Sequence, residues 1–292
     1  MLPSNYTSRR LEVFLLHGHQ HGIVIDYRAL FEYLATIAPA ARARQASGKL
    51  YALPTIEIEG DRVRLIAYEG PIGESPLIYN RLNAQERIER LASGEVVARK
   101  THALLNLVNR ELIVEYNFRG AKATDIAWLC EMLAIGHSDW DGLDLSATPM
   151  IEPSFLEALN KFRVIKIASV KVARPNQNWN ADLKNMLGEM ASDSDARMAD
   201  VTLYASRKGT LSMTKGLVTY IKQMVSSVLP SIAGASISGI REGETADSTI
   251  SLNKHLQAQT VRVRLNDDGY VDDQDIEDKI RDYLNSRENP QS

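Results

Sequence analysis

The chain has 292 residues, of which 44% are hydrophobic and 24% are charged, and its formal net charge is −3. These values match an average globular protein, so they exclude a disordered chain, a collagen and a disulfide scaffold. The single cysteine, Cys130, excludes an intramolecular disulfide and a cysteine metal cluster, and it indicates a reducing compartment. The N-terminus lacks an apolar signal core and no run approaches the length of a membrane span, so we expect a cytoplasmic protein.

The first half has the pattern of mixed helices and strands. Residues 11–16 form an apolar strand, and Asp26 is placed to cap a helix over 27–38, where Leu30, Phe31 and Leu34 recur at helical spacing. The other elements predicted here are strand pairs 50–58 with 62–68 and 96–108 with 112–118, a short helix 87–91, and a helix capped by Thr124 or Asp125 that ends at Ile135. Residues 142–153 hold turn residues without a clear period, which favours a domain boundary there.

The second half alternates strands and helices. The predicted elements are strand 162–172, helix 181–190, strand 201–205, amphipathic helix 214–229, strands 237–241 and 260–265, and an acidic helix 276–284. The order predicts an α+β fold of two mixed α/β domains, with antiparallel-rich sheets and helices packed on one face. The domains are expected at 1–148 and 149–292, the second being an α/β sandwich that carries the acidic terminal helix.

Charge is unevenly distributed along the chain. Residues 265–292 have a net charge of −6, whereas residues 160–230 have a net charge of +6. This asymmetry indicates either a polyanion-binding face or an internal electrostatic contact, in which the terminal helix covers the basic region and DNA displaces it. The alternative is a set of solvated helix faces with a solubilising tail.

Two motifs suggest metal ligands, and each has a plainer interpretation. His17, His19 and His21 could converge on one zinc ion if they lay on one strand face, but the glycines beside them favour an exposed hairpin loop. The segment from Asn266 to Asp275 imitates part of a calcium loop, although Arg264 stands where the first carboxylate is needed and Asp-Gly is also an ordinary turn. No metal site is assigned to either.

Catalytic signatures are incomplete. The segment from Gly234 to Ser238 lacks the last glycine of a nucleophile elbow, and no phosphate-binding or dinucleotide-binding glycine motif occurs. The triplets that start at Asp182 and Glu277 have the residue types of a metal-dependent nuclease, without an obvious partner acid. The sequence therefore favours a non-enzymatic protein without a cofactor, and leaves a metal-dependent nuclease or hydrolase effector, or a protein–protein adaptor, as alternatives.

Basic residues form the most suggestive pattern. Two pairs flank the second strand pair and fall at one end of it if it is antiparallel. Others lie on and around the strand at 162–172, after the strand at 201–205 and on the helix at 214–229, and phosphate recognition uses such clusters. Lys215 and Lys222, seven residues apart, would share a helix face. Ordinary surface lysines are the alternative interpretation. The candidate DNA-binding residues are Arg99, Lys100, Arg119, Lys122, Lys166, Lys171, Arg174, Arg207, Lys208, Lys215 and Lys222.

The series of elements resembles the RexA-like exclusion proteins, a family of prophage-encoded defence proteins. The resemblance is carried by RALFEYL, KLYALPTIEIEGDRVRLIAYEG, ERLASGEVVARKTHALLNLVNRELIVEYNFRGAKATDIAWL, FRVIKIASVKV, DLKNMLGEM and DARMADVTLYAS. It implies a homodimeric protein that binds double-stranded DNA, senses phage DNA or phage DNA–protein complexes, and signals to a membrane effector in abortive infection. No short motif carries the family's activity, so no functional residue is transferred, and HGHQHG and the acidic helix depart from the family pattern.

Overall fold

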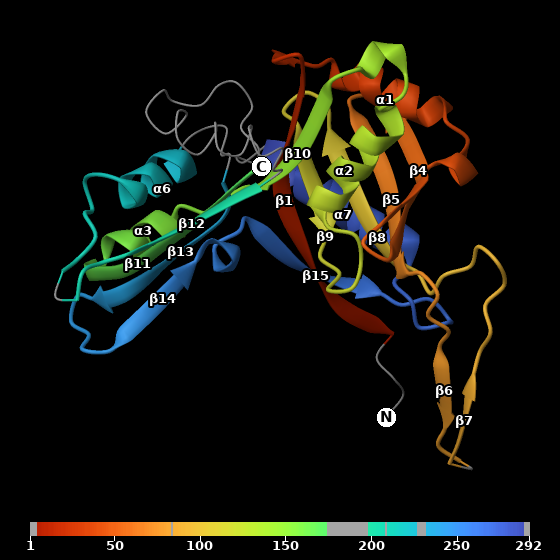
Figure 1. Ribbon diagram of the computed structural model, residues 1–292. Coiled ribbons are helices and arrows are strands. Elements are labelled where there is room, and N and C mark those ends of the chain that lie inside the picture. Colours follow the sequence, from red (N-terminus) through yellow and green to blue (C-terminus); the bar gives the residue numbers. More distant parts are fainter. Residues whose placement is uncertain (1–4, 83, 174–197, 208, 227–231, 289–292) are drawn as a thin grey trace. The chain divides into compact units, whose positions relative to one another are not determined.

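The computed structural model describes residues 5–82, 84–173, 198–207, 209–226 and 232–288 (Figure 1). The chain has the expected α+β fold, with antiparallel sheets and helices packed on them. It divides into two compact units, and each is described by itself. Unit 1 comprises Met1–Glu12, Leu16–Ala147 and Gln259–Ser292, and unit 2 comprises Val13–Leu15 and Thr148–Ala258.

This division differs from the predicted one at the C-terminal end. Unit 1 ends its main segment at Ala147, close to the expected boundary, but residues 259–292 belong to unit 1 and not to the second domain. The reason is that C-terminal elements pair and pack with strands from the N-terminal half of the chain. Strand β15 (Ala258–Arg264) pairs with β1 (Tyr6–Gln20), and helix α7 (Asp273–Glu288) packs on β8 and β9. Along the chain, unit 2 is therefore an insertion within unit 1.

Unit 1 is built on one large sheet. Within the described residues this sheet has nine strands, in the order β10-β1-β9-β8-β5-β4-β3, with β2 and β15 also paired to β1. The bounds are β2 (Ile23–Val24), β3 (Ala43–Ala46), β4 (Lys49–Glu59), β5 (Arg62–Pro71), β8 (Arg99–Asn106), β9 (Glu111–Glu115) and β10 (Leu143–Pro149). A separate two-stranded ribbon, β6 (Leu77–Asn80) and β7 (Gln85–Ile88), is inserted between β5 and β8.

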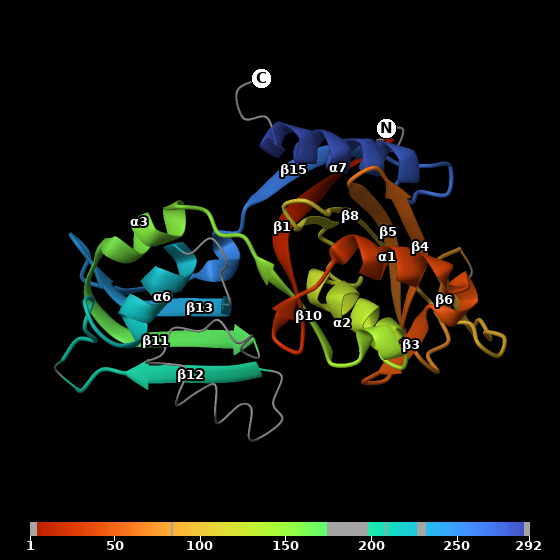
Figure 2. The same ribbon diagram turned by 90° about the horizontal axis from the view of Figure 1, so that it is seen from above.

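The alternation of side chains along β5 and β8 assigns the two faces of this sheet. Val63, Leu65 and Leu105 are buried on the face that carries α1 (Tyr27–Thr36) and α2 (Ala123–Ala134). The residues between them, such as Arg64 and His102, point to the opposite face and contact α7. Figure 2 shows α7 on one side of the strands and α1 and α2 on the other. Unit 1 therefore has helices on both faces of its sheet, and the expectation of helices on one face is wrong for this unit.

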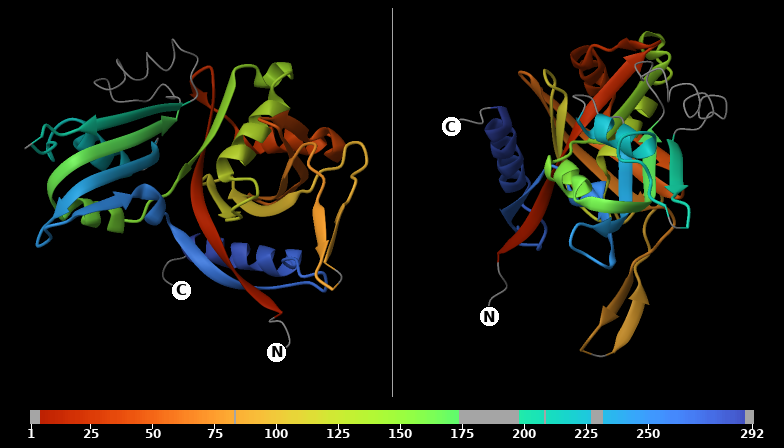
Figure 3. Two further views of the ribbon diagram at one scale, coloured as in Figure 1. Left: turned by 60° about the horizontal axis from the view of Figure 1, so that its bottom comes forward. Right: turned by 90° about the vertical axis from the view of Figure 1, so that its left-hand side faces the viewer.

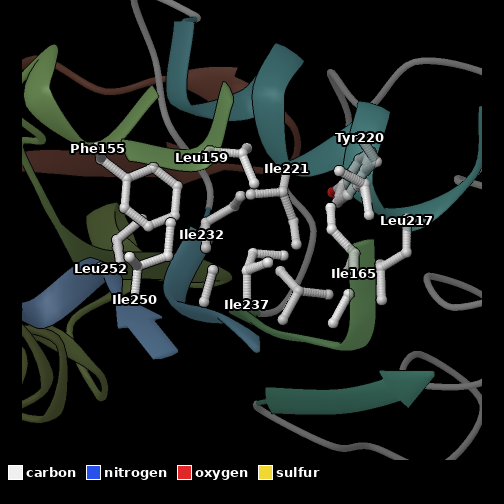
Figure 4. Packing of buried hydrophobic residues seen from close by; sticks show 14 of the residues in the cluster. Phe155, Leu159, Ile165, Leu217, Tyr220, Ile221, Ile232, Ile237, Ile250 and Leu252 are labelled. Carbon is white, nitrogen blue, oxygen red and sulfur yellow. The ribbon is translucent and has the colours of Figure 1, made fainter. Parts of the chain in front are cut away.

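Unit 2 contains a four-stranded antiparallel sheet in the order β12-β11-β13-β14. Its strands are β11 (Phe162–Ala173), β12 (Met198–Tyr204), β13 (Ile232–Arg241) and β14 (Asp247–Ser251), and α3 (Ser154–Asn160) and α6 (Leu217–Ser226) pack on it. Phe155, Leu159 and Ile221 of the helices bury their side chains against Ile237 and Ile250 of the strands (Figure 4). Burial of this apolar surface is the main stabilising contribution to unit 2.

Short 3-10 helices occupy Pro39–Ala41, Ser138–Trp140 and Leu252–Lys254. Beside the first of them, Arg42 closes the C-terminal end of α1. Its guanidinium is buried and donates hydrogen bonds to the carbonyl oxygens of Ala35, Ile37 and Pro54 at 2.7 to 2.9 Å. The last carbonyls of a helix have no partner inside the helix, so this arginine supplies one.

Several predicted elements are confirmed. Asp26 caps α1 by accepting the Ala29 N–H at 3.1 Å, and the strand pairs β4–β5 and β8–β9 are antiparallel hairpins. β11, β12, β13, β15 and α7 lie where strands and a helix were expected, with bounds shifted by a few residues. The predicted helix 181–190 lies outside the described residues.

Other predictions are wrong, for local reasons. Residues 87–91 are not a helix, because Gln85–Ile88 pairs with Leu77–Asn80 as a ribbon. Helix α2 is capped at Lys122 and not at Thr124 or Asp125, because the Asp125 carboxylate turns back to accept the Lys122 N–H at 2.8 Å. Residues 142–153 contain strand β10, which was not predicted because the turn residues there obscure any period. Helix α3 and strand β14 were not predicted either.

Candidate nucleic-acid interface

The structure brings two of the predicted basic pairs together. Arg99 and Lys100 begin β8, and Arg119 and Lys122 follow the end of β9. The hairpin is antiparallel, so all four lie at the same end of it. The Asn117 side chain ties the two segments by donating to the Lys100 carbonyl oxygen at 3.0 Å, and the Lys122 ammonium donates to the Asn117 carbonyl oxygen. We call Arg99, Lys100, Arg119 and Lys122 the basic root.

The four cations of the basic root differ in whether an acidic side chain already pairs with them. Lys100 bonds Asp273 at 2.7 Å; burial acts against its charged form, but this hydrogen bond and the nearby Tyr68 raise its pKa overall. Burial lowers the pKa of Lys122, whose ammonium lies 4.8 Å from the centre of the Tyr116 ring. Among the described residues, no acidic side chain forms an ion pair with Arg99 or Arg119. These two arginines are therefore the cations of the root that can take a phosphate.

A buried polar cluster lies beneath the start of α7. His102 is 2% exposed, and its Nδ1 lies 2.8 Å from Glu115 Oε2 while its Nε2 lies 3.1 Å from Asp273 Oδ1. Arg9 pairs with the second oxygen of Glu115 at 2.9 Å. Partial burial acts to raise the pKa of Asp273, but the Lys100 hydrogen bond and the His102 charge lower it overall. The cluster fixes the N-terminal end of α7 on the sheet.

Ion pairs in both directions hold the acidic terminal helix on the sheet of unit 1: some have the arginine on the sheet, and others have it on the helix. Further ion pairs along α7 are Arg62–Glu288 at 2.8 Å, Arg64–Glu277, Arg281–Glu59 at 3.1 Å and Arg287–Glu111 at 2.8 Å. Ile276, Ile280 and Leu284 are buried along the same helix. The carboxylates of Asp273, Glu277 and Glu288 therefore pair with cations of unit 1, and the expectation that this helix covers the basic region at 160–230 stays a prediction.

The basic residues of unit 2 do not form one uniform basic face. Lys166 pairs with Asp247 at 2.8 Å and Lys171 lies 3.6 Å from Asp200, so an acid compensates each of these lysines on the sheet. Lys215 precedes α6 and is not on a helix face shared with Lys222, contrary to the prediction, because the helix begins at Leu217. Arg207 and Lys215 are exposed, and Lys222 is partly exposed. Arg174 and Lys208 lie outside the described residues.

Two of the three histidines in the run HGHQHG belong to strand β1. β1 continues through Gln20, so His17 and His19 lie on a strand and not in the expected loop, and the turn is at His21 and Gly22. A glycine is needed at position 18 of this strand, because the Ile25 and Leu145 side chains occupy the space that a Cβ would take. His17 is buried, which lowers its pKa to about 4, with smaller contributions from the charges of Arg110 and His19. In the described ranges, no three His, Cys, Asp or Glu side chains are grouped as metal ligands.

The other singled-out motifs also have local roles. The calcium-like segment is a turn in which Gly269 has a φ of +79°, and Asp272 accepts the Asp275 N–H at 2.9 Å at the start of α7. Glu277 of one nuclease-like triplet binds Arg64, whereas Asp182 of the other lies outside the described residues. Cys130 is fully buried, which raises its pKa to about 12.

Sequence reasoning missed the β6–β7 ribbon. Its strand residues are all exposed, including Leu77 at 61%, Tyr79 at 63% and Ile88 at 66%. A cavity of about 320 Å³ at its base has a mixed lining in which the charged side chains are Glu74 and Glu95, and two carboxylates do not suit an anion. Neither LIYN nor QERI alternates polar and apolar residues, so the periodic signature of a half-buried strand is absent from both.

Searches against models of protein families and against curated proteins found no match to this chain. None of the helices in the described residues combines the length and the apolar character that a bilayer crossing requires.

Proposed function

We propose that this chain is a DNA-binding protein of antiviral defence, which holds duplex phosphates through Arg99 and Arg119 of the basic root. The observation that carries the proposal is that two arginines on either side of the β8–β9 hairpin lie at the same end of it, without an acidic partner among the described residues. A guanidinium without a carboxylate partner is suited to phosphate, because it can donate two parallel hydrogen bonds.

The wider setting rests on the resemblance to RexA-like exclusion proteins. On that basis the protein acts in the cytoplasm as a homodimer, recognises phage DNA or phage DNA–protein complexes, and signals to an effector partner in abortive infection. The chemistry assigned to it is binding, with no catalytic step.

Fluorescence anisotropy of a labelled duplex over a salt series tests the proposal. The wild-type chain is expected to bind, and its affinity should fall steeply with salt because each neutralised phosphate releases counterions. The Arg99→Gln/Arg119→Gln variant should reduce the slope of log K against log salt by about 1.8, since each phosphate contact contributes about 0.9.

The matched control is Arg28→Gln/Arg281→Gln. These exposed arginines pair with Asp61 and Glu59 at the β4–β5 turn, at the opposite end of β5 from the root, so the variant removes the same charge elsewhere. It should keep the wild-type slope. Equal slopes for both variants would contradict the assignment to the root. Cleavage of the duplex on adding magnesium would support a nuclease instead, and absence of binding at low salt would support an adaptor.

A further inference from the structure

The β6–β7 ribbon has two chemically different faces. Leu77 pairs with Ile88 and Tyr79 with Glu86, so one face is largely apolar. Ile78 pairs with Arg87 and Asn80 with Gln85, so the other face carries two carboxamides and a guanidinium. Both strands are exposed over their whole length, and in the right-hand view of Figure 3 the ribbon extends away from the sheet.

The ribbon projects from the end of the sheet that holds the basic root. β5 ends at Pro71 and the chain returns from the ribbon to begin β8 at Arg99. Arg99 therefore begins the strand that follows the ribbon along the chain and is a member of the root, and Arg119 lies at the same end. A duplex held by its phosphates at these arginines would lie beside the ribbon.

The polar face of the ribbon has the residue types that recognise base edges. Asparagine and glutamine pair with the N6 and N7 groups of adenine, and arginine pairs with O6 and N7 of guanine, all in the major groove. The major groove of B-DNA, about 12 Å wide, admits a two-stranded β-ribbon. Asn80 accepts the Leu82 N–H at 2.9 Å through its oxygen, which orients its amide group. Arg87 is 70% exposed in a pair with the exposed Glu89, and such surface pairs exchange readily.

We propose that the polar face of the β6–β7 ribbon enters the major groove and reads base edges through Asn80, Gln85 and Arg87. The inference rests on the proposed function and adds sequence recognition to it. In this arrangement the apolar face points away from the bases. Glu86 lies on that face, so its carboxylate is kept away from the base edges in the groove. The root then supplies phosphate contacts that position the protein, and the ribbon supplies specificity.

The test is selection of bound duplexes from a random-sequence pool, followed by affinity measurements on a selected and a scrambled duplex. The wild-type chain should enrich a sequence and prefer it by about tenfold or more for each base contact. Methylation of guanine N7 in that sequence should interfere with binding, since this atom lies in the major groove.

The Asn80→Ala/Arg87→Ala variant should lose the preference while keeping its affinity for the scrambled duplex. Both side chains are exposed, so folding is not at stake. The control is Tyr79→Ala/Glu86→Ala, which truncates a facing pair on the opposite face of the same ribbon and should keep the preference.

The outcomes separate this inference from the proposed function. Binding without enrichment, or enrichment that survives Asn80→Ala/Arg87→Ala, overturns the ribbon's role and leaves phosphate binding by the root in place. Absence of binding to any duplex overturns both. If Tyr79→Ala/Glu86→Ala abolishes a dimer in sedimentation while sequence preference is independent of the ribbon, the ribbon serves a second copy of the chain and base reading is refuted.

Discussion

Acidification provides a direct measure of the burial of His17. The pKa of this side chain falls from 6.5 to about 4 in the folded chain, first because burial disfavours the charged form and then because Arg110 and His19 add positive charge. In the unfolded chain His17 takes up a proton as the pH falls through 6.5, whereas the folded chain resists until about pH 4. The stabilisation is therefore complete above pH 6.5 and is lost as the pH falls from 6.5 towards 4.

The magnitude follows from the two pKa values. A shift of one unit corresponds to about 1.4 kcal/mol, so the full shift corresponds to about 3 kcal/mol. Between pH 7.5 and pH 4.5 the His17 contribution to the free energy of unfolding should fall by about 2.5 kcal/mol. The His17→Gln variant cannot titrate, so its free energy of unfolding should fall by about that much less than the wild type over the same interval.

Urea unfolding at the two pH values, followed by tryptophan fluorescence, measures this difference. Trp128 and Trp140 lie in unit 1, as His17 does, whereas Trp179 belongs to unit 2, so the measurement is made in a Trp179→Phe background, where the emission reports the relevant unit. His21→Gln is the control, because His21 is exposed at the turn after β1 and should show the wild-type pH dependence. Parallel pH dependence for the wild type and His17→Gln would refute the reasoning.

Three further substitutions test the packing. Ile280→Ala should lower the free energy of unfolding by about 2–5 kcal/mol in urea titrations, because this α7 side chain is 1% exposed. Asp278→Ala, on the exposed side of the same helix, should change it by less than about 0.5 kcal/mol. Arg42→Met should cost about 3 kcal/mol by the same assay, since it leaves carbonyl oxygens at the end of α1 without a donor. Gly239→Ala should cost more than about 3 kcal/mol in thermal unfolding, because its Cβ would overlap a carbonyl oxygen of β11, while Gly243→Ala, at a φ of +77° in open space, should cost about 1 kcal/mol.

Sequence patterns predicted the elements whose signals are local. The β4–β5 hairpin was visible because two alternating runs flank a tight Glu-Gly-Asp turn, and α1 was visible because Asp26 precedes a helical apolar period. The ribbon was misread because its strands have four residues each and face solvent on both sides, so no buried face imposes a period.

The candidate site was predictable only where it depends on local structure. Hairpin geometry alone places Arg99 and Arg119 at one end, which the sequence analysis anticipated. The partners of other basic residues were not predictable, because ion pairs such as Arg62–Glu288 and Lys100–Asp273 join positions far apart in the chain. The charge pattern along the sequence therefore does not reveal which cations have an acidic partner, because the fold decides those pairs.

The insertion of unit 2 within unit 1 has a consequence for synthesis. A ribosome releases residues 148–258 before residues 259–288, so unit 2 can fold while unit 1 still lacks β15 and α7. Until α7 emerges, the face of the nascent sheet that carries Arg64 and His102 has no helical cover. The arginines and apolar side chains on that face are then exposed to chaperones or to misassembly until α7 packs on them.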